Sequence, residues 1–91
     1  MNKDGQRSIY YSSRFKKSLR GIPKFVQKAF LEKEGKFLAN PFGQALETHK
    51  LHGKYKEYWA FTVIGQYRIM FLFMKDGGVG FINIGNHDIY R

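Results

Sequence analysis

The sequence predicts an α+β fold with the element order β-α-α-β-β-β, in which two helices pack on one face of a small, mostly antiparallel sheet. Three observations predict it. Apolar residues recur at helical spacing from Phe15 to Leu38, aromatic and β-branched residues dominate residues 58–73, and two Gly-containing turns divide the second half into strands. Ninety-one residues, of which 43% are hydrophobic, predict a single domain over residues 1–91.

The first half is predicted to hold one short strand and two helices. Residues 7–11 favour a strand, and Ser12 or Ser13 suits the cap of a helix. Gly21 and Pro23 break that helix, and Pro23 suits the first turn of a second helix. The first helix is expected to bury Phe15, Leu19 and Ile22, and the second Phe25, Val26, Ala29, Phe30, Phe37 and Leu38, with Lys24, Lys28, Lys33 and Lys36 outward and Asn40-Pro41 at its end.

The second half is predicted to be three antiparallel strands, residues 58–64, 67–73 and 79–85. Gly65-Gln66 and Asp76-Gly77 mark the hairpins, so Ile64 should face Tyr67 and Val63 should face Arg68. The helix-covered face is then expected to hold Tyr58, Ala60, Thr62, Ile64, Tyr67, Ile69, Phe71 and Phe73. The other face, with Trp59, Phe61, Val63, Arg68, Met70 and Leu72, should be open and apolar, which implies a partner.

Charge and composition indicate which partners the protein attracts and which kinds of chemistry it lacks. Basic residues outnumber acidic ones 16 to 7, for a net charge of +9, which attracts phosphates or an acidic protein. Without cysteine, disulfide and thiolate chemistry are excluded, and three histidines without HxxxH or HExxH spacing predict no metal site. We expect no cofactor. No signal core or membrane-length apolar run is present, so we expect a cytoplasmic protein without membrane contact.

Three side chains are candidates for chemistry. Arg68, inside an otherwise uncharged strand, needs an anionic partner, which is either a phosphate or a structural ion pair with Glu47 or Glu57. His49 and His87 can transfer protons near neutral pH, and the alternative for each is an inactive turn or loop histidine.

Four further residues are candidates for holding RNA. Lys50, Lys54 and Lys56 surround a Gly-containing loop and suit either phosphate contact or solvent exposure. Tyr90 either stacks on an RNA base or packs at the terminus.

The segment LETHKLHGKYKEYWAFTVIGQYRIMF, followed by INIGNHDIYR, resembles the RelE/ParE toxin superfamily of bacterial toxin–antitoxin systems, and within it the RelE-type mRNA interferases of the YafQ and YoeB kind. The H-x-L-x-G, Y-R-I and I-G-x-H segments carry the resemblance, in order and at family spacing. It implies a RelE-like fold and a metal-independent endoribonuclease. In this family the ribose 2′-hydroxyl attacks the adjacent phosphate of mRNA, mostly in the decoding site of the ribosome.

By position, the resemblance implies that His49 and His87 transfer protons, with His87 as general acid, and that Arg68 contacts the scissile phosphate. It also implies that Lys54 holds RNA and that Tyr90 lies near the base-stacking aromatic. Two departures concern this set. YafQ-like members carry a further histidine and an aspartate where this chain has Thr62 and Gln66, and the terminal aromatic of many relatives falls where this chain has Arg91.

Two other functions remain open. A ParE-like gyrase inhibitor shares the fold but usually lacks the histidine pair, and a relative without activity would bind RNA only. All three readings predict an acidic antitoxin whose disordered tail folds over Trp59, Phe61, Met70 and Leu72 and offsets the +9 charge.

Overall fold

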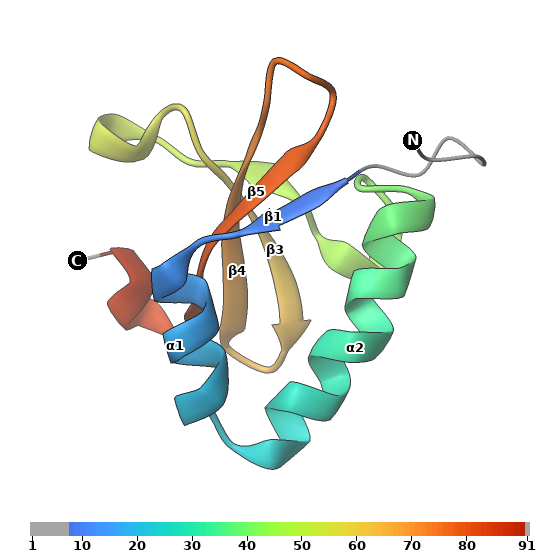
Figure 1. Cartoon of the computed structure of the whole chain (residues 1–91), viewed down its shortest axis with the longest axis vertical. Helices are drawn as coiled ribbons and strands as arrows, with labels where there is room; N and C mark the ends of the chain where they lie inside the picture. Colours follow the sequence, from blue (N-terminus) through green and yellow to red (C-terminus); the bar gives the residue numbers. More distant parts are fainter. Residues whose placement is uncertain (1–7, 91) are drawn as a thin grey trace.

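Five strands form one mixed sheet, and two helices pack on one of its faces (Figure 1). The computed structural model describes residues 8–90, and at His87 and Asp88 the backbone alone. The elements in chain order are β1 (Ile9–Tyr11), α1 (Ser13–Gly21), α2 (Lys24–Ala39), η1 (Gln44–Leu46), β2 (His49–Lys50), η2 (Gly53–Tyr55), β3 (Trp59–Ile64), β4 (Tyr67–Phe73), β5 (Val79–Gly85) and η3 (His87–Tyr90), where η marks a short 3-10 helix.

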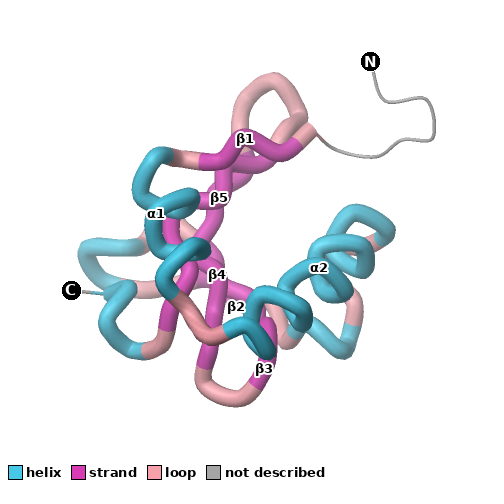
Figure 2. The backbone as a smooth tube through the Cα atoms, turned by 60° about the horizontal axis from the view of Figure 1, so that its bottom comes forward, coloured by secondary structure: helices cyan, strands magenta, loops and turns pink. Residues whose placement is uncertain are grey.

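The strand order across the sheet is β1-β5-β4-β3-β2. β1 runs parallel to β5, and every other pair is antiparallel. The tube in Figure 2 shows α1 near β1 and β5, while α2 lies toward β3. The predicted α+β fold and its element order are confirmed. The two-residue edge strand β2 and the 3-10 helices are additions that the sequence did not predict.

The helix boundaries follow the predicted capping signals. Ser12 is the N-cap of α1, since its Oγ accepts a hydrogen bond from the Phe15 amide at 2.9 Å. The same Oγ donates to the carbonyl of Ile82 at 2.7 Å, so the cap also ties α1 to β5. Pro23 stands directly before α2, and Asn40 caps the other end.

One face of α2 enters the core, but not with all the predicted residues. Val26, Phe30 and Phe37 are buried as predicted, whereas Phe25 is 59% exposed. Neighbouring helical residues point about 100° apart, so Phe25 cannot share the inward direction of Val26. Lys33, predicted to point outward, instead reaches the sheet, since its Nζ donates to the carbonyl of Val63 at 2.9 Å.

Phe37 is the centre of the aromatic core. Its ring stacks on Phe61 at 4.9 Å and meets Phe71 and Phe81 edge-on at 5.0 and 5.5 Å. These are the offset and edge-to-face arrangements that aromatic quadrupoles favour. The core therefore joins α2 to three neighbouring strands, β3, β4 and β5.

The register between β3 and β4 contains a bulge that reverses the predicted faces of β3. Ile64 pairs with Tyr67 as predicted, but Thr62, not Val63, pairs with Arg68. The skipped residue shifts the alternation by one, so Phe61 and Val63 join the helix-side core instead of Ala60 and Thr62. The prediction for β4 was right, since Ile69 and Phe71 lie in that core.

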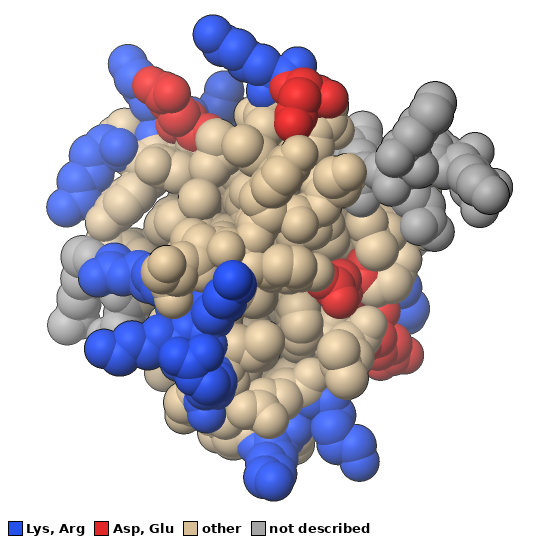
Figure 3. All heavy atoms as spheres, viewed as in Figure 1, with Lys and Arg blue, Asp and Glu red and all other residues tan. Residues whose placement is uncertain are grey.

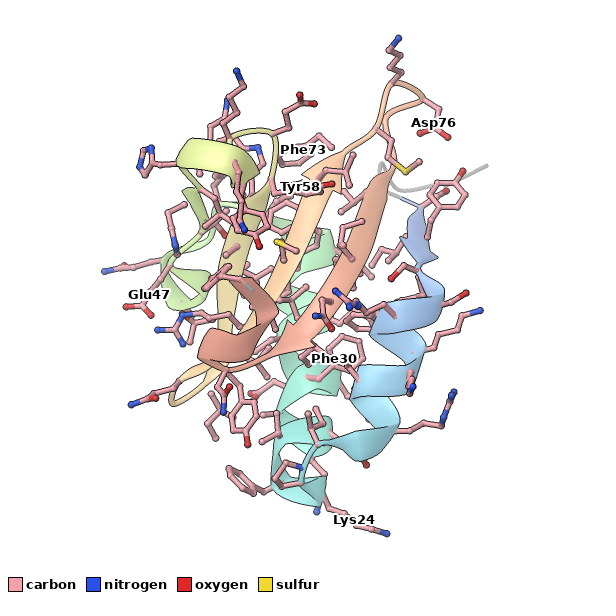
Figure 4. The ribbon with its side chains drawn as sticks, turned by 90° about the vertical axis from the view of Figure 1, so that its left-hand side faces the viewer. Lys24, Phe30, Glu47, Tyr58, Phe73 and Asp76 are labelled. Atoms are coloured by element: carbon pink, nitrogen blue, oxygen red, sulfur yellow. The ribbon has the colours of Figure 1, made fainter. Side chains whose placement is uncertain are left out.

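The open apolar face predicted from Trp59, Phe61, Met70 and Leu72 was therefore wrong. Phe61 is fully buried and Trp59 packs against the helix-side core. Met70, on the other face, is only 5% exposed. Figure 4 shows the yellow-green η2 segment and the red η3 segment in front of that face, and Ile89 of η3 is buried. Between residues 8 and 90, no helix has the length and apolar character needed to cross a membrane.

Candidate functional site

His49 and Arg68 lie on the sheet face turned away from the helices. His49 pairs with Ala60, and Arg68 pairs with Thr62. Ala60 and Thr62 are two residues apart on β3, so they point to the same side, opposite Phe61. The two functional candidates therefore flank β3 on one face, with their strands about 10 Å apart, which leaves room for a nucleotide linkage between them.

A pocket of about 250 Å³ opens at this place. His49 and Arg68 line it together with Gln66, Asn86 and Tyr90. These residues come from β2, the β3–β4 hairpin, β4, and the segment that follows β5. Parts of the chain that are distant in sequence thus supply an imidazole, a guanidinium, a phenol and two amides to one hollow.

Arg68 is oriented by neutral groups. Its Nη1 donates to the carbonyls of Gly65 and Tyr67, at 2.8 and 3.3 Å. Across residues 8–90 it forms no ion pair with either Glu47 or Glu57, the carboxylates considered from the sequence. Carbonyls direct a guanidinium without compensating its charge, so, as far as the described side chains go, Arg68 presents an oriented positive charge to the pocket.

His49 is held by a backbone contact. Its Nδ1 lies 3.0 Å from the carbonyl oxygen of Glu47, while the side chain as a whole is exposed on the edge strand. The carboxylate of Glu47 accepts a hydrogen bond from Thr62 Oγ1 at 2.8 Å. The ring is therefore attached to a turn that is itself bonded to β3.

Tyr90 is half-buried at the edge of the pocket. Burial raises the pKa of its phenol, and the positive charge of Arg68 opposes part of that rise. The Tyr55 hydroxyl donates to the Tyr90 carbonyl at 2.5 Å, and the two rings lie 6.2 Å apart. Tyr55, which sequence reasoning did not select, thus fastens the terminal 3-10 helix to the η2 segment.

The three predicted RNA-binding lysines lie outside this pocket. Lys50 points to the opposite face from His49, where its Nζ is 5.8 Å from the centre of the Trp59 ring. Lys54 and Lys56 line a separate hollow of about 490 Å³ with Gly53, Glu57 and Tyr58. Lys54 Nζ also lies 5.2 Å from the Tyr55 ring centre. The Lys54 hollow is therefore linked to the pocket through Tyr55.

Three residues near the pocket stand differently from the sequence predictions: His87 was selected, whereas Asn86 and Gln66 were not. The His87 side chain lies outside the described part of the structure, although its backbone begins η3 next to Asn86. Asn86 was missed, and its position directly before His87 was the available signal. Gln66 was noted only as a departure from relatives, yet it lines the pocket two residues before Arg68.

Basic side chains also gather away from the pocket. Figure 3 shows a group of Lys and Arg at the lower left, over α1. That helix carries Arg14, Lys16, Lys17 and Arg20, all exposed, and no acidic residue. Among the described residues, no cluster of three His, Cys, Asp or Glu side chains has the geometry to hold a metal ion.

Solved structures with the same architecture exist. The chain overlays YafQ from E. coli with a TM-score of 0.65 and 24% identity, covering 93% of this chain and 98% of that one. It overlays the toxin–antitoxin complex RelBE2 from Mycobacterium tuberculosis with a TM-score of 0.74 and 13% identity, covering 90% and 99%. The chain has the RelE-type toxin fold.

The chain also overlays a third structure, the YoeB/ParE toxin from Agrobacterium tumefaciens. The TM-score is 0.74 and the identity 11%, over 88% of this chain and 98% of that one. No family model matches the sequence, and no curated protein matches it. The agreement with these RelE-type structures is thus one of fold, over nearly the whole length of each chain.

Proposed function

We propose that this protein is the toxin of a type II toxin–antitoxin system and an endoribonuclease that cleaves mRNA on the ribosome. One observation carries the proposal: His49, Arg68 and Tyr90 line one pocket, and Arg68 is oriented there by two neutral carbonyls and by no carboxylate among the side chains that the structure describes. A fixed cation beside an imidazole suits a phosphodiester that must lose a proton and gain negative charge during the reaction.

In the proposed reaction, His49 takes the proton of the ribose 2′-hydroxyl. The 2′-oxygen forms a bond to the adjacent phosphorus, and Arg68 stabilises the added negative charge of the phosphorane. The bond from phosphorus to the 5′-oxygen then breaks, and His87 donates a proton to that leaving oxygen. The products are a 2′,3′-cyclic phosphate and a free 5′-hydroxyl. These side chains supply proton transfer and charge stabilisation by themselves, which is why we propose a metal-independent reaction without a cofactor.

The remaining candidates hold the RNA in this proposal. Tyr90 stacks on a base next to the pocket, while Lys54 and Lys56 contact phosphates beyond Tyr55, and Lys50 contacts the backbone as it passes the sheet edge. Mutating the lysines should therefore raise KM more than it lowers kcat.

An acidic antitoxin is the proposed protein partner. Two observations support it: the net charge of +9, and the fold shared with the RelBE2 toxin–antitoxin complex. In the apolar patch first expected to receive its tail, Phe61 and Met70 are buried and Trp59 and Leu72 are half-buried, so we propose that the partner uses another surface. The setting proposed for both partners is the cytoplasm, where mRNA is translated.

Expression in cells, with primer extension on a reporter message, tests the activity. We expect codon-periodic cuts from the wild type, and we expect His87→Ala to slow cleavage at least about 100-fold, in the range for losing one acid–base group. His52→Ala is a matched control, because that exposed loop histidine does not line the pocket. A loss of less than about threefold in His87→Ala would remove His87 from the mechanism.

The chemistry is tested with a synthetic message that carries a single 2′-deoxynucleotide at the mapped cut site. We expect no cleavage there, because the nucleophile is missing, and unchanged cleavage of the all-ribose message. Cutting at the deoxy position would rule out 2′-hydroxyl attack.

A ParE-like gyrase inhibitor is the second candidate, since the YoeB/ParE toxin from Agrobacterium tumefaciens shares the fold. The same cells distinguish the two functions. Growth arrest with DNA damage and intact messages would favour gyrase inhibition, whereas cut messages without DNA damage favour the nuclease. Neither effect, with RNA binding retained, would indicate an inactive RNA-binding relative.

A further inference from the structure

Glu47 holds an unusual backbone conformation next to the pocket. It has φ 52° and ψ 39°, and it is the one non-glycine residue with positive φ among residues 8–90. A side chain in this left-handed region costs conformational energy, and such residues cluster where geometry serves a function. Glu47 is also exposed, so burial of its side chain does not compensate for that cost.

Hydrogen bonds hold Glu47 in place. Its amide donates to the carbonyl of Gln44 at 3.3 Å, and its carboxylate accepts from Thr62 Oγ1 at 2.8 Å. The left-handed turn then directs its own carbonyl to His49 Nδ1 at 3.0 Å. Glu47 is thus bonded to β3 through its carboxylate and to the His49 imidazole through its carbonyl.

The contact to the carbonyl decides the protonation pattern of the ring. A carbonyl oxygen can only accept a hydrogen bond, so Nδ1 must carry the hydrogen. In the neutral imidazole the other nitrogen, Nε2, then has the free lone pair. His49 is a pocket-lining residue, so this arrangement presents it as a proton acceptor.

Thr62, which anchors the Glu47 carboxylate, lies on β3 between the strands that carry His49 and Arg68. Thr62 pairs in register with Arg68, while His49 pairs with Ala60 on the same strand. The Glu47–Thr62 bond therefore ties the turn that holds His49 to the β3 residue opposite Arg68. A shift of this turn would alter both the tautomer of His49 and its distance from the guanidinium.

We propose that Glu47 is a positioning residue: through its left-handed backbone and its bond to Thr62, it keeps His49 in the Nδ1–H tautomer and so makes His49 the proton acceptor. The catalytic part of this inference rests on the proposed nuclease function, whereas the tautomer and its dependence on Glu47 do not.

Nitrogen-15 NMR of the labelled full chain tests the tautomer directly, at a pH where the ring is neutral. In the wild type we expect a protonated Nδ1 and a bare Nε2 at His49, the reverse of the tautomer that free histidine favours. A wild-type spectrum with the hydrogen on Nε2 would overturn the proposal.

Two pairs of variants test the role of the anchor. Glu47→Gln and Thr62→Ser keep an acceptor and a donor, so both should retain the Nδ1–H tautomer. Glu47→Ala and Thr62→Val remove the bond, and the ring should shift toward the Nε2–H form. Glu32→Ala, at an exposed position on α2, is the control and should leave the His49 spectrum unchanged. The two disruptive variants act from different elements, so if one fails to fold the other still tests the bond.

Kinetics separate positioning from a general loss of structure. In the disruptive variants we expect kcat to fall about tenfold with KM within about twofold, since only the orientation of a proton-transfer group changes. Equal spectra and equal kcat in the conservative and disruptive variants would contradict the inference. If wild-type protein shows the Nδ1–H tautomer but no cleavage, the positioning stands and the proposed function fails.

Discussion

At the scale of single residues, Arg68 is the feature on which the candidate site depends. Arg68 is half-buried, and its guanidinium is bonded to two neutral carbonyls, so it is oriented without being neutralised by any side chain that the structure describes. Partial burial strengthens its attraction for an anion relative to a fully solvated cation, because the effective dielectric constant is lower. A phosphate in the pocket would thus meet a charge that is already aimed and partly desolvated.

We therefore expect Arg68→Ala to slow single-turnover RNA cleavage about 100-fold or more, in the range for losing one stabilising donor in a transition state. Arg68→Lys should recover part of the rate, because it keeps the charge but not the planar fork. Lys75→Ala, an exposed cation at the other end of β4, is the matched control and should retain the wild-type rate. A rate in Arg68→Ala within about threefold of wild type would show that this guanidinium does not act on the phosphate.

At the scale of elements, α2 packs on the sheet face opposite the candidate site and helps to hold the strands that carry His49 and Arg68. Phe37 touches rings on β3, β4 and β5 and is fully buried, whereas Phe25 on the same helix is 59% exposed. These two positions make a natural pair for a stability experiment, because residue type and helix are the same and burial differs.

Phe37→Ala should lower the free energy of unfolding by about 3–5 kcal/mol, since it removes buried surface and leaves a cavity that the packed strands cannot fill. Phe25→Ala should change it by less than about 0.5 kcal/mol. Urea denaturation monitored by circular dichroism measures both. Comparable losses in the two variants would contradict the assignment of the inward face of α2.

The β4–β5 hairpin is joined to β1 through Asp76. Its carboxylate accepts from the Gly78 amide at 2.8 Å and from the Tyr10 hydroxyl at 2.9 Å. The Gly78 amide first, and the Tyr10 hydroxyl second, lower the pKa of Asp76 below its ordinary value. A lowered folded-state pKa means that this stabilisation is complete above the ordinary pKa of 3.8 and is lost as the pH falls through the lowered value.

The melting temperature of the wild type should therefore fall in acid partly because Asp76 becomes protonated. Asp76→Asn should be less stable than the wild type near neutral pH, and the difference between the two should shrink below about pH 4. Thermal melts at a series of pH values measure it. A constant difference across that range would show that the carboxylate charge has no part in holding the hairpin.

At the scale of the whole molecule, the basic charge is spread over distinct surfaces. Arg68 serves the pocket, Lys54 and Lys56 line the neighbouring hollow, and the α1 cations form a separate group (Figure 3). A net charge of +9 attracts polyanions at long range, whereas the placement of the cations decides which phosphates are contacted.

Binding of a short single-stranded RNA should consequently weaken as salt rises. If Arg68, Lys54 and Lys56 contact one phosphate each, a plot of log affinity against log salt should have a slope of about −2, from about 0.7 per contact on single strands. Lys54→Ala and Lys56→Ala should each reduce the slope by about 0.7, as measured by fluorescence anisotropy. An unchanged slope in both variants would place the RNA elsewhere.

Part of the site was predictable from the sequence and part was not. Arg68 and His49 were selected because a charge in a strand and an imidazole before a glycine turn are local signals. Gln66 and Tyr55 carry no such signal, and Asn86 is marked only by its place directly before His87, since amides and phenols in turns are common and acquire a role only from what lies next to them. The role of His87 stays a prediction, which the His87→Ala variant tests.

By itself, the sequence determined the kind and order of the main elements, because helix periodicity, the Ser12 cap, and the hairpin residues act over a few neighbours. Only the tertiary structure decided which face each strand presents. The skipped residue at Val63 inverts β3, buries Phe61, and sets Thr62 opposite Arg68. A change of one residue in register reverses every side chain beyond it, and its energy comes from contacts across the molecule, which no local pattern records.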